Sequence, residues 1–227
     1  MYSLNIDGIK YPLDKEWTLK EWMDLHKFDT SQEFLWPRMI SQATGAPSEL
    51  VYQIDHEVLH QAMVVITRNM QPSWVSLSPT YKGQKFIDLN KLTIGQFIDL
   101  EVALSRGLES NLHWLVGTLY STEGESCLEW NYEVGFAAVQ TWYVRRKQIY
   151  SEYEDLFDME DGDGTPSNED PGHAWYDMLM VLADGEFLNI QHVVDRPMIE
   201  ALNFLAWKKD QARKLELEQK KLQMTRR

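Results

Sequence analysis

A helix start at Thr93 is the feature that most constrains how this chain can fold. Gln96 follows Thr93 by three residues, which is the spacing of a capping box. In that motif the threonine hydroxyl accepts from the third helical amide, and the glutamine side chain accepts from the amide of the cap residue. Phe97 and Leu100 then begin an apolar pattern at helical spacing. The block therefore predicts a well-defined helix start, and by itself it implies no function.

The beginning of the chain predicts a small β-hairpin. Residues 2–6 and 9–13 alternate between apolar and polar types and are joined by Asp-Gly at 7–8, the strongest short signal for a type I′ turn. Two further strand-like pieces, at 74–77 and 85–89, stand among Pro, Ser and Gly residues. We expect them to pair with the opening hairpin, although no local signal fixes that register.

Most of the remaining chain carries helical patterns. Thr18 with Glu21 and Thr30 with Glu33 repeat the capping-box spacing. The predicted helices cover residues 18–28, 31–43, 48–69, 94–104, 109–120, 128–157, 174–183 and 197–207, followed by a charged C-terminal helix to residue 227. The sequence thus predicts an α+β protein that is mainly α-helical, with a small N-terminal β-hairpin element, a multi-helix body and a long charged C-terminal helix.

An acidic segment interrupts these helices. Residues 158–172 are densely negative and lack periodic apolar residues, which is typical of a linker or loop. We therefore expect three parts: the β-element and helical body at 1–157, an acidic loop at 158–173, and a helical C-terminal subdomain with a basic helix at 174–227. No internal repeat is evident in the sequence.

The chain is acidic as a whole, but its end is basic. Among 227 residues the formal net charge is −13, which opposes nucleic-acid binding by the body of the protein. Residues 208–227 hold eight basic and three acidic residues, a net charge of +5, which leaves −18 on the remainder. No apolar run approaches the ~20 residues that span a bilayer, and the single Cys127 fits a reducing compartment. We expect a soluble protein that does not bind membranes.

One motif resembles a catalytic site. His56-Glu57-Val-Leu-His60 matches H-E-x-x-H, which on a helix places two imidazoles one turn apart to bind zinc, with the glutamate as general base. The apolar stripe of the predicted helix lies nearly opposite the histidines at 100° per residue and consists of Val51, Ile54, Val58 and Ala62. We therefore interpret His56 and His60 as residues of a polar helix face. No catalytic residue, metal or cofactor is expected, and a zinc hydrolase is the remote alternative.

The C-terminal helix is the best candidate for partner binding. It has few apolar residues and gains little from burial within one chain, so it can lie along a partner or in a shared bundle. A solvated, fraying end is the equal alternative. The candidate contact residues are Lys208, Lys209, Arg213, Lys214, Leu215 and Leu222. Upstream, the basic run at 145–147 and the acidic residues at 152–155 predict surface pairs at i,i+4 spacing.

Five short stretches support a resemblance. They are Asp-Gly-Ile-Lys-Tyr-Pro-Leu at 7–13, Trp-Thr-Leu-Lys-Glu-Trp at 17–22, Ala-Thr-Gly-Ala-Pro-Ser-Glu-Leu at 43–50, Lys-Leu-Thr-Ile-Gly-Gln-Phe-Ile-Asp-Leu-Glu at 91–101 and Leu-His-Trp-Leu-Val-Gly-Thr-Leu-Tyr at 112–120. In these stretches the chain resembles virion-assembly proteins of large tailed bacteriophages, a group of tail-assembly chaperones and baseplate-hub assembly proteins.

The resemblance implies a non-enzymatic protein that binds other phage tail or virion proteins, such as tape-measure or hub subunits, and shields their apolar or helical segments until incorporation. It implies the host cytoplasm during infection as the location, with association with the virion left open. The alternative in the same setting is a structural virion subunit (hub, connector or capsid-associated) that stays in the particle. Homo-oligomerisation is also left open.

Overall fold

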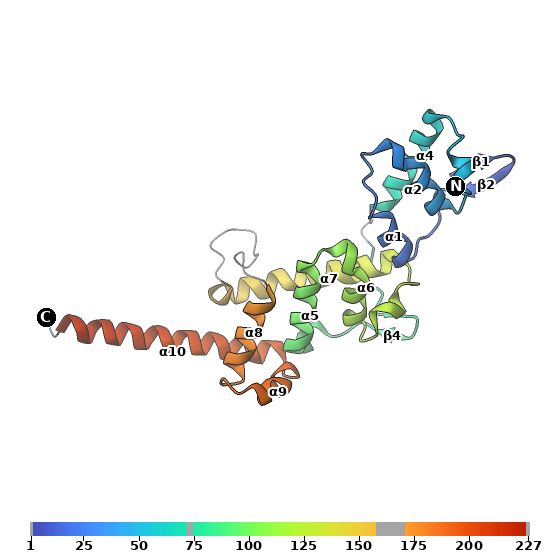
Figure 1. Ribbon diagram of the computed structural model, residues 1–227. Helices are drawn as coiled ribbons and strands as arrows, with labels where there is room; N and C mark the ends of the chain where they lie inside the picture. Colours follow the sequence, from blue (N-terminus) through green and yellow to red (C-terminus); the bar gives the residue numbers. More distant parts are fainter. Residues whose placement is uncertain (1, 72–74, 158–170, 226–227) are drawn as a thin grey trace. The chain divides into compact units, whose positions relative to one another are not determined.

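The computed structural model describes residues 2–71, 75–157 and 171–225 (Figure 1). These residues form a mainly α-helical α+β structure, as the sequence predicts. The α-helices are α1 (Leu19–Leu25), α2 (Trp36–Thr44), α3 (Ser48–Val51), α4 (His56–Met70), α5 (Ile94–Ser105), α6 (Leu108–Leu119), α7 (Tyr132–Glu152), α8 (Pro171–Leu182), α9 (Ile190–Val194) and α10 (Met198–Thr225). The strands are β1 (Ser3–Ile6), β2 (Ile9–Pro12), β3 (Thr80–Tyr81) and β4 (Gln84–Lys85). The 3-10 helices are η1 (Glu33–Leu35), η2 (Leu89–Lys91), η3 (Gly124–Cys127), η4 (Glu154–Leu156) and η5 (Phe187–Asn189).

The chain forms two compact units, and each is built from two stretches of sequence. Unit 1 comprises Met1–Phe86 and Gly107–Gln140, and unit 2 comprises Ile87–Arg106 and Thr141–Arg227. These bounds differ from the expected division at residue 157, because α5 packs with α8, α9 and α10. The expected acidic loop falls mostly on residues outside the described part of the chain, and α8 begins at its last residues.

The opening hairpin of unit 1 forms as predicted. β1 and β2 pair antiparallel, with Leu4 opposite Tyr11. Asp7 and Gly8 have φ values of 50° and 83°, the positive values that a type I′ turn requires. The expected pairing of a later strand with this hairpin is wrong, since β3 and β4 pair with each other in a separate two-stranded sheet. Residues 75–77 are not in a strand.

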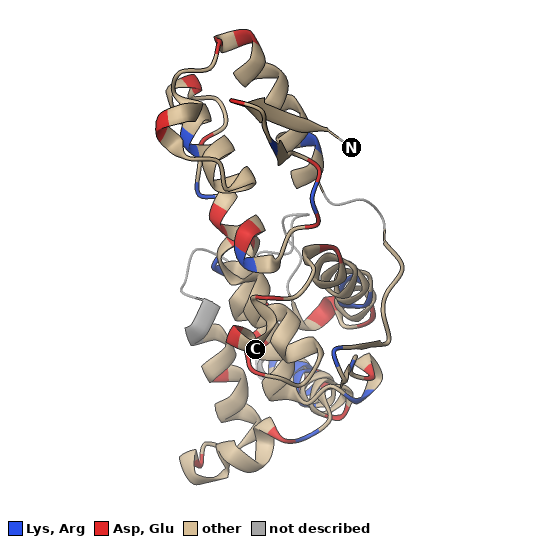
Figure 2. Cartoon of the chain, turned by 90° about the vertical axis from the view of Figure 1, so that its right-hand side faces the viewer, with Lys and Arg blue, Asp and Glu red and all other residues tan. Residues whose placement is uncertain are grey.

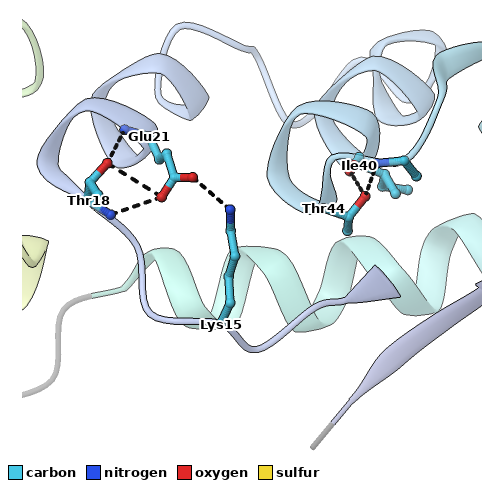
Figure 3. Close-up of polar contacts among 6 residues, drawn as sticks. Lys15, Thr18, Glu21, Ile40 and Thr44 are labelled. Carbon is cyan, nitrogen blue, oxygen red and sulfur yellow. Dashed lines mark hydrogen bonds and ion pairs between the residues drawn. The ribbon is translucent and has the colours of Figure 1, made fainter. Parts of the chain in front are cut away.

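Two of the three predicted capping boxes are present. Thr18 accepts from the Glu21 amide at 3.2 Å, and the Glu21 carboxylate accepts from the Thr18 amide at 3.0 Å (Figure 3). Lys15 also reaches this carboxylate, at 2.7 Å (Figure 3). In unit 2, Thr93 and Gln96 make the same reciprocal pair, at 3.2 and 3.1 Å.

The third predicted box, at Thr30 and Glu33, is wrong. The residue before η1 is Gln32, and no side chain caps this short helix. Asp29 instead organises the turn, because its carboxylate accepts from the Ser31 amide at 3.0 Å and from the Gln32 side chain at 2.8 Å. An aspartate that bonds to its own neighbouring backbone favours a turn over a helix start.

Several predicted helices have different bounds. The helix expected over 48–69 is split into α3 and α4, because Asp55 caps a new helix by accepting from the Glu57 amide at 2.9 Å. The helix expected to begin at 128 begins instead at Tyr132, after η3. At the other end, the expected helix over 197–207 and the charged C-terminal segment form one continuous α10 of 28 residues.

In each unit, backbone hydrogen bonds tie the start of a capped helix to the start of a long helix. The backbone of Thr18 forms an isolated antiparallel β-bridge with that of Asn131 in unit 1, and Thr93 forms one with Pro197 in unit 2. The flanking bonds run from Leu19 N to Trp130 O, Tyr132 N to Trp17 O, Ile94 N to Arg196 O and Met198 N to Leu92 O, at 2.8 to 3.0 Å. We call each arrangement a helix-start bridge. It is a structural repeat that the sequence does not reveal.

Aromatic side chains form much of both cores. In unit 1, Trp22 is buried and donates its indole N–H to the Met70 carbonyl at 2.9 Å. In unit 2, Phe97 lies edge-on to Trp142 and Trp175, with ring centroids 5.8 and 5.4 Å away. Charged residues of both signs are interspersed along the elements of each unit (Figure 2). None of the helices in the described ranges is long and apolar enough to cross a lipid bilayer.

Candidate partner-binding surface

Helix α10 changes from a buried to an exposed helix along its length. Its first two turns bury Met198, Ala201, Leu202 and Leu205 against the rest of unit 2, where α10 contacts α5, α8 and η4. Its contacts with α8 and η4 extend to Lys208 and Lys209, and its C-terminal part continues past the other helices of the unit (Figure 1). From Lys209 to Thr225 the helix is about 24 Å long at 1.5 Å per residue. The helix therefore offers a long surface for contacts outside unit 2.

Apolar residues continue along this exposed stretch. Ala212 follows the buried Leu205 by two turns, and the side chains of Leu215 and Leu222 are 59% and 64% exposed. At 100° per residue, all four lie within one broad face of the helix. We call Ala212, Leu215 and Leu222 the α10 row. It extends the face that the start of α10 buries, and in the described part of unit 2 its Leu215 and Leu222 are more than half exposed.

An apolar groove of about 660 Å³ lies where the row begins. Its walls come from η4, α8 and α10, and its lining residues are Leu156, Met178, Val181, Leu205, Trp207, Lys208, Lys209, Gln211, Ala212 and Leu215. Lys208 joins the two helices, because its ammonium donates to the Val181 carbonyl and to the Asp184 carboxylate, each at 3.3 Å. The groove therefore lies between η4, α8 and α10, and Ala212 and Leu215 of the row belong to its lining.

The structure separates the six predicted contact residues into two sets. Lys208, Leu215 and Leu222 lie on or beside the row. Arg213 lies nearly opposite Leu215 on the helix and lines a different, smaller cavity of about 130 Å³. Lys209 donates to the Asp155 carbonyl, and Lys214 pairs with Asp210 at 2.6 Å within α10. The basic residues thus mostly serve contacts within the unit, and the apolar residues remain open.

A buried charge cluster stabilises unit 2. Glu101 on α5 is only 6% exposed. Arg146 on α7 donates Nε to one carboxylate oxygen at 2.6 Å and Nη2 to the other at 2.8 Å, and the Tyr150 hydroxyl donates to the second oxygen at 2.9 Å. This two-pronged geometry is the strong form of an arginine–carboxylate pair. It joins α5 and α7 within the unit.

The cluster also sets the protonation of its members. Burial alone would lower the pKa of Arg146, but hydrogen bonds to Glu101 and the charge of that carboxylate outweigh it and hold the pKa above its usual value. Burial, and then the charge of Glu101, raise the pKa of the Tyr150 hydroxyl. Both donors therefore keep their protons at ordinary pH, as a structural cluster requires.

Sequence reasoning missed this cluster. The expected surface pairing of the basic run at 145–147 at i,i+4 spacing is wrong for Arg145, which lies 3.5 Å from Glu152, seven residues further along the helix. Arg146 turns instead to a carboxylate 45 residues away in sequence. The one available signal was Glu101 itself, which lies four residues after Phe97 on the apolar face of the predicted helix. A carboxylate at such a position requires a buried partner.

The H-E-x-x-H residues lie at the start of α4 and face solvent. His56 Nε2 lies 3.1 Å from a Glu33 carboxylate oxygen, and the side chains of both residues are more than 60% exposed. The rings of His56 and His60 lie 5.5 and 5.6 Å from that of Trp36. The predicted apolar stripe is wrong at Val58, which is exposed, since Leu59 takes the buried position.

Glu57 and His60 also border an open groove of about 710 Å³ beside Tyr2 and Arg68. Within the described residues, no group of three or more His, Cys, Asp or Glu side chains could hold a metal ion. His56 and His60 therefore lie on the polar face of α4, and the structure assembles no third ligand beside them in the part it describes. Nothing in this arrangement favours the zinc hydrolase over exposed helix-face histidines.

Cys127 is the remaining nucleophile to consider. It is fully buried at the end of η3, and burial raises the pKa of its thiol to about 11. A thiol that stays protonated and inaccessible is a poor nucleophile.

Comparisons of the chain with protein-family models, curated proteins and solved structures find no match. The function must therefore be argued from the surfaces described above.

Proposed function

We propose that this chain is a non-enzymatic assembly protein of a tailed bacteriophage, which binds other tail or baseplate proteins in the host cytoplasm during infection. Two observations support the proposal. The first is the resemblance of five sequence stretches to tail-assembly chaperones and baseplate-hub assembly proteins. The second, which carries the proposal, is the α10 row beside the apolar groove, where Leu215 and Leu222 are each more than half exposed.

Burial of this surface by a partner is favourable on physical grounds. Covering a leucine side chain completely contributes about 1.5–3 kcal/mol, and contiguous exposed apolar surface is typical of protein contact sites. A helix with apolar residues on one face, next to a groove, fits the mode in which helices pair or lie in grooves. The proposed role asks no residue to perform chemistry, and it uses Leu215 and Leu222 as the principal contacts.

A pull-down during phage infection tests this proposal. An N-terminally tagged chain should recover tail or baseplate proteins, and Leu215→Asp should reduce that recovery at least tenfold. Leu217→Asp is the matched control, because Leu217 is 51% exposed on the same helix but lies about 160° away from Leu215, so recovery should persist. If the unmodified chain recovers no virion protein, the proposal is wrong.

The same preparation separates the chaperone from a subunit that stays in the particle. Mass spectrometry of purified virions should not find this chain if it acts transiently. A fixed stoichiometry in the particle would instead identify a hub, connector or capsid-associated subunit. Both outcomes keep the phage setting, and they differ only in whether the α10 contact is released.

A further inference from the structure

We propose that the outer edge of β1 binds an extended strand of a partner protein, and that this strand is neutral or basic and carries apolar residues at alternate positions. The contact lies in unit 1 and does not involve α10, so it goes beyond the assembly role proposed above. Three features carry it: the backbone groups that point outward along β1, the different protection of the two edges of the hairpin, and the groove at the start of β1.

Backbone groups of β1 point away from β2 at two positions. The Tyr2 carbonyl accepts from the Leu13 amide at 2.9 Å, and hydrogen-bonded pairs alternate with non-bonded pairs along an antiparallel ladder. By that alternation, the N–H and C=O groups of Ser3 and Asn5 face away from β2. No described residue of the chain hydrogen-bonds to these groups, and both residues are exposed. They form a row of donors and acceptors of the kind that a further strand completes.

The two edges of the hairpin are protected differently. The outward positions of β2 are Lys10 and Pro12, which lie opposite Asn5 and Ser3. Proline has no N–H to donate, and lysine and proline are the residues that commonly protect a sheet edge against further pairing. Ser3 and Asn5 are uncharged, and both keep their N–H groups. A further strand therefore adds to β1 more readily than to β2.

The groove at the start of β1 lies beside the position of the added strand. Tyr2 precedes the buried Leu4 by two residues, so its side chain points to the same face of the hairpin. It is 60% exposed and lines the groove of about 710 Å³ together with Val64 and Val65 of α4. Adjacent residues on neighbouring strands share a face. The partner residue beside Tyr2 therefore points toward this groove, where an apolar side chain contacts Val64, which is 53% exposed.

The charge of unit 1 favours a partner strand over a second copy of the chain. Unit 1 holds eight basic and fifteen acidic residues, a net charge of −7, and the whole chain carries −13. Two copies with this charge repel each other. A neutral strand is not repelled, and a basic strand is attracted.

A displayed library of random dodecapeptides, selected on the full-length chain, is the first test. The selected peptides should alternate apolar and polar residues and be neutral or basic. Asn5→Pro removes an outward N–H and should weaken their binding about tenfold. Lys10→Pro is the matched control, because it removes the outward N–H directly opposite, so the peptides should bind it as they bind the original chain. A library that yields no peptide with this discrimination overturns the inference.

Amide hydrogen exchange, followed by NMR, locates the contact in the original chain without any substitution. The amides of Ser3 and Asn5 should exchange rapidly in the chain alone and slow about tenfold or more when a selected peptide is added, while the Lys10 amide stays fast. Unchanged exchange at Ser3 and Asn5 overturns the inference. Slowing of the same amides as the chain alone is concentrated would make a second copy the occupant and would also overturn it.

The tests of the two proposals are independent, because the peptide library contains no virion protein and β1 and α10 belong to different units. A chain that binds the peptides but recovers no virion protein would keep the β1 contact and overturn the assembly role. A chain that recovers virion proteins but binds no peptide would overturn the β1 contact alone.

Discussion

Arg146 holds the buried carboxylate of Glu101 through two hydrogen bonds, of 2.6 and 2.8 Å. The carboxylate is almost fully removed from solvent, and its only other described side-chain donor is the Tyr150 hydroxyl. Removing a charge from water is costly unless the charge is paired and hydrogen-bonded. The pair therefore stabilises the packing of α5 on α7 only as long as both of its partners are present.

Loss of one partner of this pair should destabilise the protein strongly. Arg146→Met leaves Glu101 buried without its cation, so the free energy of unfolding in urea should fall by about 3–5 kcal/mol. The double variant Glu101→Leu with Arg146→Met removes both charges and should recover most of that loss. Lys214→Ala, which breaks an exposed pair on α10, should change stability by less than about 0.5 kcal/mol. A single variant as stable as the original chain would contradict the buried geometry.

The contribution of the Thr93 capping box to stability can be measured by comparing an alanine substitution there with one at Thr30. Thr93→Ala removes the acceptor for the Gln96 amide and should lower the free energy of unfolding by about 1 kcal/mol. Thr30→Ala tests the box that does not form, since no side chain caps η1, and its effect should be near zero. Equal losses in the two variants would show that the hydroxyl of Thr93 is not acting as a cap.

Gly117 should not tolerate a methyl group. A Cβ there would lie 2.8 Å from the Thr122 carbonyl oxygen and 2.9 Å from backbone atoms of Gly124, and backbone cannot move aside as a side chain can. Gly117→Ala should therefore cost about 1–3 kcal/mol in thermal or urea unfolding. Gly135→Ala is the comparison, because its nearest neighbours are side-chain methyl groups of Leu19 and Val116 and not backbone atoms, and alanine gains helix propensity of up to about 1 kcal/mol. A Gly117→Ala chain at least as stable as Gly135→Ala would refute this packing.

Cys127 should be unreactive in the folded chain and should couple stability to alkaline pH. Burial raises the pKa of its thiol to about 11, so a disulfide reagent such as DTNB at pH 8 should react only after unfolding. Because the folded pKa lies above the unfolded value, the stabilising contribution is complete below about pH 8.5 and is lost as the pH rises toward 11.

Urea midpoints at pH 8 and 10.5 would measure that loss. Cys127→Ala should show a smaller drop between the two pH values than the original chain. Part of the drop should remain, because burial also raises the pKa of Tyr120 to about 12. Rapid labelling of the native thiol at pH 8 would contradict its burial.

Local signals predicted local structure well. The Asp-Gly turn and the Thr93 box were predictable because all of their partners lie within a few residues. The same spacing failed at Thr30, where Asp29 competes for the neighbouring amides. The apolar periodicity over 48–69 predicted one helix where the structure has two, because the periodicity continues across the point where Asp55 starts a new helix.

Contacts between distant segments could not be read from the sequence. Leu215 and Leu222 were identifiable from their spacing on α10, but Met178 and Val181 of the groove come from another helix. Two compact units built from alternating stretches of chain likewise leave no compositional boundary to recognise. The helix-start bridges pair residues about a hundred positions apart, and backbone bonds of this kind carry no side-chain signature.

The helix-start bridge of unit 2 has a mechanical consequence. The bonds from Met198 N to Leu92 O and from Ile94 N to Arg196 O, with the buried first turns of α10, fix this helix at one end only. A rod of 28 residues is about 42 Å long, so turning unit 2 by about 10° displaces the tip by about 7 Å. Force applied near Leu222 therefore acts first on the bonds of Lys208 to the Val181 carbonyl and the Asp184 carboxylate, and then on the two peptide hydrogen bonds at Met198 and Ile94.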